Sequence, residues 1–273
     1  MPSRLIAPPF EPGSVWLVGA GPGDPGLLTL HAAHALEQAD IVVHDSLVSH
    51  DVLALAPHAR LEAAGKRAGG PQTSQLRINQ RLIHLARQGN RVVRLKGGDP
   101  LVFGRGGEEA LALAAAGIPF RIVPGISAGI GATAAAGIPL THRQVARGVT
   151  FATGHDSSGG MAAIDWESLA RGAEVLVLYM ALRQIGRIAQ RLLAAGRRPD
   201  EAVALISRAT TPEQQVIRTT LAEAESAVRL VAPGSPTLIV IGPVVALSPL
   251  LSAWQQTAPM AVSTDAEPAR AKG

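Results

Sequence analysis

Residues 15–30 read VWLVGAGPGDPGLLTL, a short apolar run that passes into a turn rich in glycine and proline. An apolar run of this length, bounded by glycine, is typical of a buried parallel strand. The turn differs from the dinucleotide fingerprint G-x-G-x-x-G, because Asp24 stands where the third glycine would be and Pro22 lacks a backbone donor. The sequence therefore disfavours a nicotinamide-dependent enzyme.

Two more glycine-rich turns follow apolar runs. GGDP at 97–100 comes after the run 92–96, and PGIS at 124–127 comes after the run 121–123. Glycine in such turns permits positive φ and lets the backbone approach a ligand closely. Loops at the carboxyl ends of strands form the ligand crevice of open α/β sheets. We therefore expect the three turns to line one crevice, although any single one could be ordinary turn chemistry.

The first half of the chain alternates apolar runs with helical patterns. Ser74 is a suitable N-cap for the helix that follows it, and Gly89 and Gly117 are suitable helix ends. This alternation predicts an open, mostly parallel α/β sheet. The expected strands cover residues 15–18, 41–43, 91–95 and 120–123, and the expected helices cover 27–38, 74–87 and 108–116.

The segment GIPLTHR at 137–143 breaks the alternation, and a second set of elements follows it. Three of the later strands have no long helix between them, which predicts a mixed sheet. The expected elements are strands at 149–153, 174–179, 202–207, 215–220 and 237–241, and a helix at 182–195. We therefore predict two α/β domains with an active-site cleft between them. They cover 15–140 and 145–250, joined near 140–146, with flexible tails at 1–14 and 259–273.

The composition of the 273-residue chain is that of a globular protein, with 47% hydrophobic and 17% charged residues. The absence of cysteine excludes disulfides, zinc–thiolate sites and thiol nucleophiles. A formal net charge of +4 and 3% aromatic residues give no support to a nucleic-acid partner. No signal peptide or apolar run of membrane-spanning length is visible. We therefore expect a cytoplasmic protein with no membrane or nucleic-acid partner.

Nearly all of the positive charge is arginine, since lysine occurs only at Lys66, Lys96 and Lys272. Guanidinium groups suit carboxylates and phosphates. A genome with many arginine and alanine codons would give the same composition, so the bias by itself does not select a ligand.

Further segments extend the pattern of 15–30 along the chain. They are ADIVVHDSLVS at 39–49, GKRAG at 65–69, RVVRLKGGDPLVFGRGGEE at 91–109, GIPFRIVPGISA at 117–128, GIPLTHR at 137–143, and, more weakly, VLYMAL at 177–182 and SPTLIVIG at 235–242. Together, in order and without large gaps, they resemble the tetrapyrrole (corrin/porphyrin) methylase family. The FGRGGEE continuation and the D-x-L-V-S stretch favour members that act on uroporphyrinogen III over members that act on later corrin intermediates.

The resemblance implies transfer of methyl groups from S-adenosyl-L-methionine to ring carbons of uroporphyrinogen III, with S-adenosyl-L-homocysteine as the by-product. Two transfers would give precorrin-2, which feeds either sirohaem or cobalamin biosynthesis. The family also implies a homodimer. Two rival functions are a nucleic-acid-modifying methylase, which would need a more basic face, and a non-catalytic cofactor sensor, which would not need Asp45 and Lys66.

In the family, the cofactor lies folded in the cleft and is held mainly by main-chain groups. The matching positions here are Pro22, Gly97, Gly98, Asp99, Val102, Ser127, Ala128, Met180, Ala209, Pro236 and Thr237. Ala209 stands where relatives often carry glycine. Asp99 could accept hydrogen bonds from a ligand or could close an Asx-turn. Met180 could contact the cofactor or fill the core.

Methylation of a pyrrole carbon leaves a cationic ring that must lose a proton from a bridging carbon. A general base contributes about 10²–10⁴-fold to such a step. Asp45, just after the expected strand 41–43, is the candidate base, unless it caps the next turn. Lys66 matches the proton donor of the family pattern, and it could equally pair with substrate carboxylates.

Arginines in the matching motifs are expected to meet the acidic side chains of the substrate. These are Arg67, Arg105 and Arg143, which flank glycine-rich turns or the break at 137–143. His31 and His34 stand three residues apart, but no acidic or cysteine partner accompanies them in a recognisable spacing. We therefore place them on the surface and expect no metal.

Overall fold

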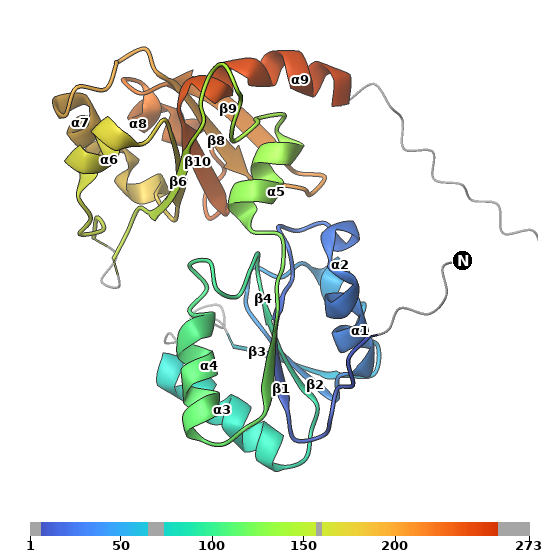
Figure 1. The fold of residues 1–273 in the computed structure, drawn as a ribbon. Helices are drawn as coiled ribbons and strands as arrows, with labels where there is room; N and C mark the ends of the chain where they lie inside the picture. Colours follow the sequence, from blue (N-terminus) through green and yellow to red (C-terminus); the bar gives the residue numbers. More distant parts are fainter. Residues whose placement is uncertain (1–6, 65–73, 157–159, 256–273) are drawn as a thin grey trace, which may run out of the picture.

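The computed structural model describes residues 7–64, 74–156 and 160–255. The chain forms two α/β domains, one above the other in Figure 1. The lower domain holds a five-stranded sheet in the order β3-β2-β4-β1-β5, and every neighbouring pair is parallel. Its strands are β1 (Val15–Gly19), β2 (Ile41–His44), β3 (Arg60–Ala63), β4 (Val92–Lys96) and β5 (Phe120–Val123). All of their carboxyl ends therefore meet at one edge of the sheet.

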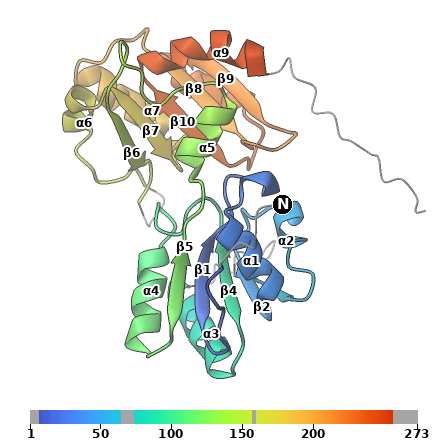
Figure 2. The ribbon, with the colours of Figure 1, turned by 45° about the vertical axis from the view of Figure 1, so that its right-hand side comes forward.

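Helices cover both faces of this parallel sheet (Figures 1 and 2). Trp16 and Val18 pack towards α1 (Leu30–Gln38) and α2 (His50–Leu53), whereas Val15 and Leu17 pack towards α3 (Gln75–Arg87) and α4 (Gly106–Ala115). This division follows from the two-residue period of a strand. Ser74 caps α3 as predicted, because its hydroxyl accepts a hydrogen bond from the amide of Arg77.

The expected flexible arm at 1–14 needs a correction at its described end. Phe10 is buried, and its ring stacks on Trp16 with 4.6 Å between the centroids. The four prolines of this segment suggested a loose chain, but a single large aromatic residue supplies enough apolar area to hold it against the core. The expected tail at 259–273 lies outside the described residues.

The upper domain contains a mixed five-stranded sheet in the order β6-β7-β10-β8-β9. Its strands are β6 (Val149–Thr153), β7 (Val175–Tyr179), β8 (Ala202–Ser207), β9 (Gln215–Thr220) and β10 (Thr237–Ile241). Strands β6 and β7 are parallel, whereas β10 is antiparallel to both of its neighbours and β8 is antiparallel to β9. The predicted fold class, with a parallel sheet followed by a mixed one, is confirmed.

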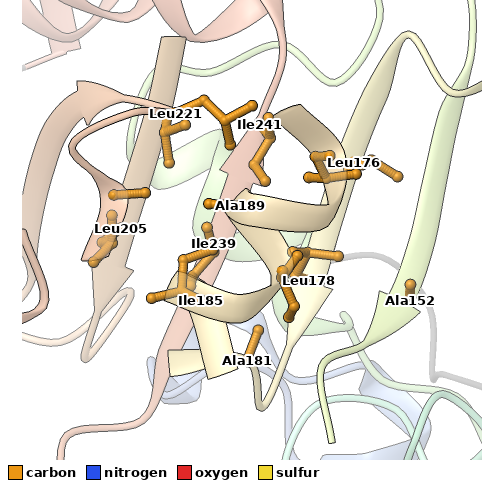
Figure 3. Packing of buried hydrophobic residues seen from close by; sticks show 14 of the residues in the cluster. Ala152, Leu176, Leu178, Ala181, Ile185, Ala189, Leu205, Leu221, Ile239 and Ile241 are labelled. Carbon is orange, nitrogen blue, oxygen red and sulfur yellow. The ribbon is translucent and has the colours of Figure 1, made fainter. Parts of the chain in front are cut away.

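One face of the mixed sheet is covered by α6 (Trp166–Gly172), α7 (Ile185–Ala194) and α8 (Ala224–Ala227). Figure 3 shows Ile185 and Ala189 of α7 packed against Leu178, Leu205 and Ile239 of the sheet. The remaining elements are α5 (Ala128–Ala135), α9 (Ser248–Gln255) and the 3₁₀ turns η1 (Pro25–Leu27), η2 (Leu182–Gln184), η3 (Val228–Leu230) and η4 (Pro243–Leu247).

The chain passes between the domains earlier than we expected. Ala132 and Ala136, in and just after α5, are buried against Val177 and Val240 of the mixed sheet. Helix α5 therefore belongs to the upper domain, as Figure 1 shows, and the crossing lies at 124–127 rather than near 140–146. The break in pattern at 137–143 is instead the connection from α5 to β6 within that domain.

Asp40 joins the beginnings of two neighbouring strands. Its carboxylate accepts hydrogen bonds from the backbone amide of Arg91 at 2.7 Å and from the Arg91 guanidinium at 3.1 and 3.2 Å. The side-chain hydrogen bond from Arg91 holds the pKa of Asp40 below its ordinary value. A carboxylate with a lowered folded-state pKa stabilises the protein above its unfolded-state pKa, and this contribution is lost as the pH falls through the folded-state pKa.

We therefore predict that Asp40→Asn lowers the free energy of unfolding at neutral pH. The loss should not exceed about 1 kcal/mol, because the ion pair is partly exposed. Urea denaturation at several pH values would measure it. The difference from wild type should shrink below about pH 4, the ordinary pKa of aspartate. A difference of the same size at pH 3 and pH 7 would contradict this role.

Candidate active site

The three glycine-rich turns meet at the carboxyl edge of the parallel sheet. Gly21 and Gly98 exchange two backbone hydrogen bonds, at 2.7 and 3.2 Å. A Cβ atom on Gly125 would lie 2.3 Å from the carbonyl oxygen of Gly98, and one on Gly19 would lie 2.5 Å from the amide nitrogen of Gly125. Only glycine fits at such separations, because there is no room for a side chain between the backbones. The predicted convergence of the turns is confirmed.

A cleft of about 540 Å³ opens between these turns and the upper domain. This volume lies in the usual range for small-molecule sites. Predicted site residues lining it are Pro22, Asp45, Gly97, Gly98, Asp99, Val102, Arg105, Ser127, Ala128, Met180 and Pro236. Met180 and Pro236 follow β7 and precede β10, so both domains contribute to the walls.

Three predicted site residues do not line the cleft. The carbonyl oxygen of Ala209 lies against Gly23 of the first turn, and Thr237 hydrogen-bonds to the carbonyl of Ser235 beside the cleft. Arg143 lies in an exposed turn between His142 and Ala146. Two further predicted residues, Lys66 and Arg67, lie outside the described part of the chain.

Asp99 ties two of the turns together. Its Oδ1 accepts a hydrogen bond from the amide of Leu101 at 2.8 Å, and its Oδ2 accepts one from the amide of Gly125 at 3.1 Å. The first contact is the Asx-turn that the GGDP motif allowed. Because each carboxylate oxygen can accept a second hydrogen bond, Asp99 can hold the turns and still bind a ligand.

Tyr179, the single tyrosine of the chain, fastens the upper domain to the third turn. Its hydroxyl lies 2.6 Å from Ser127 Oγ and accepts a hydrogen bond from the amide of Gly129 at 2.7 Å. Its ring packs on Phe103, with 4.7 Å between the centroids. The sequence analysis did not single out Tyr179 or Phe103, although Tyr179 lies within the VLYMAL match.

Strained backbone is concentrated at the cleft. Phe103, Arg105 and Met180 line it and have φ values of 51°, 60° and 52°. Left-handed φ values in residues other than glycine cost of order 1–3 kcal/mol each and persist where the surroundings enforce them, often at functional sites. Of the five residues other than glycine with left-handed φ in the described part of the chain, three therefore line the cleft.

Arg105 is already paired at the rim of the cleft. Its guanidinium donates two hydrogen bonds to the Glu108 carboxylate, at 2.9 and 2.7 Å, and both side chains are more than half exposed. These hydrogen bonds hold the pKa of Glu108 below its ordinary value. The three-residue spacing in RGGEE could have revealed the pair.

A cluster of charged residues lies beneath the cleft, and the sequence analysis did not anticipate it. Glu109 Oε1 accepts hydrogen bonds from Arg94 Nε at 3.0 Å, Lys96 Nζ at 3.1 Å and Gln75 Nε2 at 3.1 Å. The Arg94 guanidinium also donates to Asp45, and Lys96 Nζ lies 3.9 Å from the other oxygen of Asp45. Burial lowers the pKa of Lys96, and the neighbouring Arg94 charge adds to this effect.

The sequence signal for this cluster was weak but present. Arg94 and Lys96 stand two residues apart in an otherwise apolar strand. They therefore lie on one face of the strand, and charged side chains are almost never fully buried unless they are paired. In the structure their side chains are 2% and 3% exposed. Glu109, at the opposite end of the ion pairs, is fully buried.

Comparison with known proteins defines the class of this chain. Residues 14–225 match the family model of the tetrapyrrole (corrin/porphyrin) methylases. The chain belongs to this family. The family membership predicted from the sequence, and with it the class of activity, is confirmed.

The relatives point to one branch of the family. The chain is 60% identical to a uroporphyrinogen-III C-methyltransferase of a Sinorhizobium species, over 88% of this chain and 86% of that protein. It is 53% identical to siroheme synthase 1 of Yersinia enterocolitica over 86% of this chain, but spans only 49% of that longer protein. A uroporphyrin-III C-methyl transferase from Thermus thermophilus, crystallised with S-adenyl homocysteine, aligns with a TM-score of 0.75 at 41% identity, covering 86% of this chain and 99% of that one.

The described residues contain neither a cluster suited to a metal ion nor a helix suited to a membrane. No group of three or more histidine, aspartate or glutamate side chains there is arranged to hold a metal ion. No helix in that part of the chain has both the length and the apolar character needed to cross a membrane.

The glycine contacts yield a direct test. We predict that Gly125→Ala destabilises the protein by about 1–3 kcal/mol, the usual range for overpacking, because the new methyl group would collide with the Gly98 carbonyl. Gly172→Ala is the matched control, since a Cβ there meets nothing within 4 Å. Thermal unfolding of both variants would measure the effect. Equal melting temperatures for Gly125→Ala and wild type would contradict the tight packing of the turns.

Proposed function

We propose that this chain methylates ring carbons of uroporphyrinogen III, with S-adenosyl-L-methionine as the methyl donor and precorrin-2 as the product of two transfers. The observation that carries the proposal is the cleft in which three glycine-rich turns face Met180 of the second domain. The 60% identity to a uroporphyrinogen-III C-methyltransferase and the fold shared with a related enzyme crystallised with S-adenyl homocysteine support it.

The residues of the cleft fit a nucleoside-containing donor. The turns expose backbone groups without side chains at Gly97 and Gly98, and the half-exposed Met180 gives an apolar wall. The proposed cofactor-binding residues are those that line the cleft, together with Ala209 and Thr237 beside it. When bound, S-adenosyl-L-methionine would supply a methyl group already activated by its sulfonium. The protein then has to align the acceptor carbon and exclude water.

Asp45 is the proposed general base. Asp45, Arg94 and Lys96 all line the cleft. The Asp45 side chain is 30% exposed and those of Arg94 and Lys96 are 2% and 3% exposed, so Asp45 is the most open of the three to a bound substrate. An acidic side chain at this point can accept the proton that the methylated ring must lose from a bridging carbon. Lys66, the proposed proton donor, lies outside the described residues.

We predict that Asp45→Ala loses turnover by about 10²–10⁴-fold, the usual contribution of a general base, and keeps its affinity for S-adenosyl-L-homocysteine. Incubation with methyl-labelled S-adenosyl-L-methionine and uroporphyrinogen III would measure turnover, and calorimetry would measure affinity. Single-turnover rates close to wild type would remove Asp45 from the mechanism. No transfer of label to the tetrapyrrole by the wild-type protein would overturn the proposed function itself.

Binding of the acidic macrocycle is assigned to arginines at the rim. Arg105 lines the cleft and already holds the Glu108 carboxylate in a two-point contact, which is the geometry that a substrate carboxylate would use. We predict that Arg105→Ala raises the KM for uroporphyrinogen III about 10- to 150-fold, as expected for the loss of a charge-assisted contact worth about 1.5–3 kcal/mol. Cofactor affinity should stay unchanged.

Comparing Arg143→Ala with Arg105→Ala distinguishes substrate binding by the exposed turn from substrate binding at the rim of the cleft. Arg143 does not line the cleft, so its substitution should leave the KM for uroporphyrinogen III near the wild-type value. Steady-state kinetics on both variants would decide. An unchanged KM in Arg105→Ala would refute the assignment of substrate binding to this side chain.

We also propose that the chain forms a homodimer and acts in the cytoplasm. The product would enter sirohaem or cobalamin biosynthesis, and the identity to siroheme synthases supports the first route. Light scattering of the purified protein would test the dimer.

A further inference from the structure

The charged cluster beneath the cleft is organised around Glu109. Three donors from two elements converge on its Oε1, namely Arg94 and Lys96 of β4 and Gln75 of α3. Its Oε2 is buried and has no hydrogen-bond partner among the described residues. Glu109 lies on α4, on the side of the two cations away from the cleft, and Asp45 lies on the cleft side.

Burying this cluster of charges costs folding free energy. Taking charges out of water costs several kcal/mol per ion, and replacing a buried ion pair by apolar residues is often neutral or stabilising. A buried acceptor without a partner costs roughly a further 1–3 kcal/mol. The same positions on a strand flanked by Val92, Val93 and Leu95 could hold apolar side chains. Stability therefore does not explain why four charges are gathered here.

The contacts that the two cations make with Asp45 account for the cluster. Arg94 donates to Glu109 through Nε and to Asp45 through Nη2, so one guanidinium bridges the two carboxylates. Lys96 bridges the same two groups, at 3.1 Å from Glu109 and 3.9 Å from Asp45. Formally the cluster holds two cations and two anions. Each cation is therefore shared between a buried carboxylate and the one that faces the substrate.

We propose that Glu109 and Lys96 are positioning residues that fix the orientation and the basicity of the Asp45 carboxylate for the methyl-transfer reaction. This inference rests on the proposed function and on the role assigned there to Asp45. Glu109 draws part of the positive charge of Arg94 and Lys96 away from Asp45, and Lys96 opposes it by adding positive charge next to Asp45.

Other titratable groups near Asp45 or along the cleft stay constant in the test. Asp45 is bordered on its own strand end by His44, whose ring lies 3.1 Å from the Asp45 carbonyl oxygen. The further groups along the cleft among the described residues are Asp99, Arg105 and Glu108. Arg94 and Lys96 are the cations that contact the carboxylate directly.

Removing the charge of Glu109 and removing that of Lys96 should shift the pH dependence of turnover in opposite directions. Without the Glu109 charge, both cations act on Asp45 alone, which stabilises its charged form and makes it a weaker base. Without the Lys96 charge, Asp45 keeps only Arg94, which is shared with Glu109, so its charged form is less stabilised and it becomes a stronger base. The acid limb of the kcat profile reports this ionisation in the bound complex.

The experiment is the pH profile of kcat, from initial rates of label transfer, for Glu109→Gln and Lys96→Met. Glu109→Gln keeps the shape of the side chain, and Lys96→Met keeps most of its length without the charge. We expect the acid limb to move to lower pH in Glu109→Gln, with kcat reduced roughly tenfold, and to higher pH in Lys96→Met. The KM values for both substrates should stay near wild type.

The double variant Lys96→Met/Glu109→Gln removes one charge of each sign. It leaves Arg94 and Asp45 as a balanced pair, so its acid limb should return towards that of wild type because the two opposite shifts offset each other. If one single variant fails to fold, the other still tests the proposal through the direction in which its own acid limb moves.

Glu201→Gln is the matched control. Glu201 pairs with Arg197 at 2.9 Å, and both side chains are mostly buried in the upper domain away from the cleft. This variant should change the melting temperature but not the acid limb. Acid limbs that coincide with wild type in both cluster variants, or that move in the same direction, would overturn the proposal.

These results distinguish a failure of the positioning role from a failure of the proposed role of Asp45. If Asp45→Ala is inactive and the two cluster variants keep the wild-type profile, only the positioning role fails. If Asp45→Ala is fully active, the base is misassigned and the positioning role falls with it.

Discussion

The site depends on the contact between the glycine backbones that end β1, β4 and β5. A Cβ atom on Gly19 or on Gly125 would collide with the carbonyl oxygen of Gly98, and a pair of backbone hydrogen bonds joins the first turn to the second. Parallel strands bring their carboxyl ends to one edge of the sheet, and glycine lets the turns there close on each other. The result is a rigid surface of main-chain groups, which can follow a ligand closely without side chains in the way.

The second domain completes this surface because the chain crosses directly after the third turn. Helix α5 begins at Ala128 and packs on the mixed sheet, so residues 124–127 link the domains, and Ser127 among them lines the cleft. Tyr179 then binds the start of α5 from the opposite side. A change in the position of the upper domain would therefore move both Met180 and the third turn.

Most strands could be predicted from the sequence, because apolar runs bounded by glycine or proline are unambiguous in a chain of this kind. Strands β8, β9 and β10 have the expected limits. Strand β3 was not predicted because RLEA is a polar edge strand. Helix α5 was not predicted because AGIGATAA has small residues on every side and no amphipathic period. The crossing point was misplaced for the same reason. Of the site, the turns were predictable from their glycines, but the buried cluster was not, since pairing between β4 and α4 is a tertiary contact.

The central claim is that turns from one domain and Met180 from the other hold a single methyl donor beside the charged cluster. A crystal structure of this chain with S-adenosyl-L-homocysteine tests it most directly. We expect the nucleoside to contact Gly97, Gly98 and Asp99 on one side and Met180 on the other, with its sulfur open towards Asp45. A nucleoside bound away from these residues, or held by one domain alone, would contradict the shared cleft.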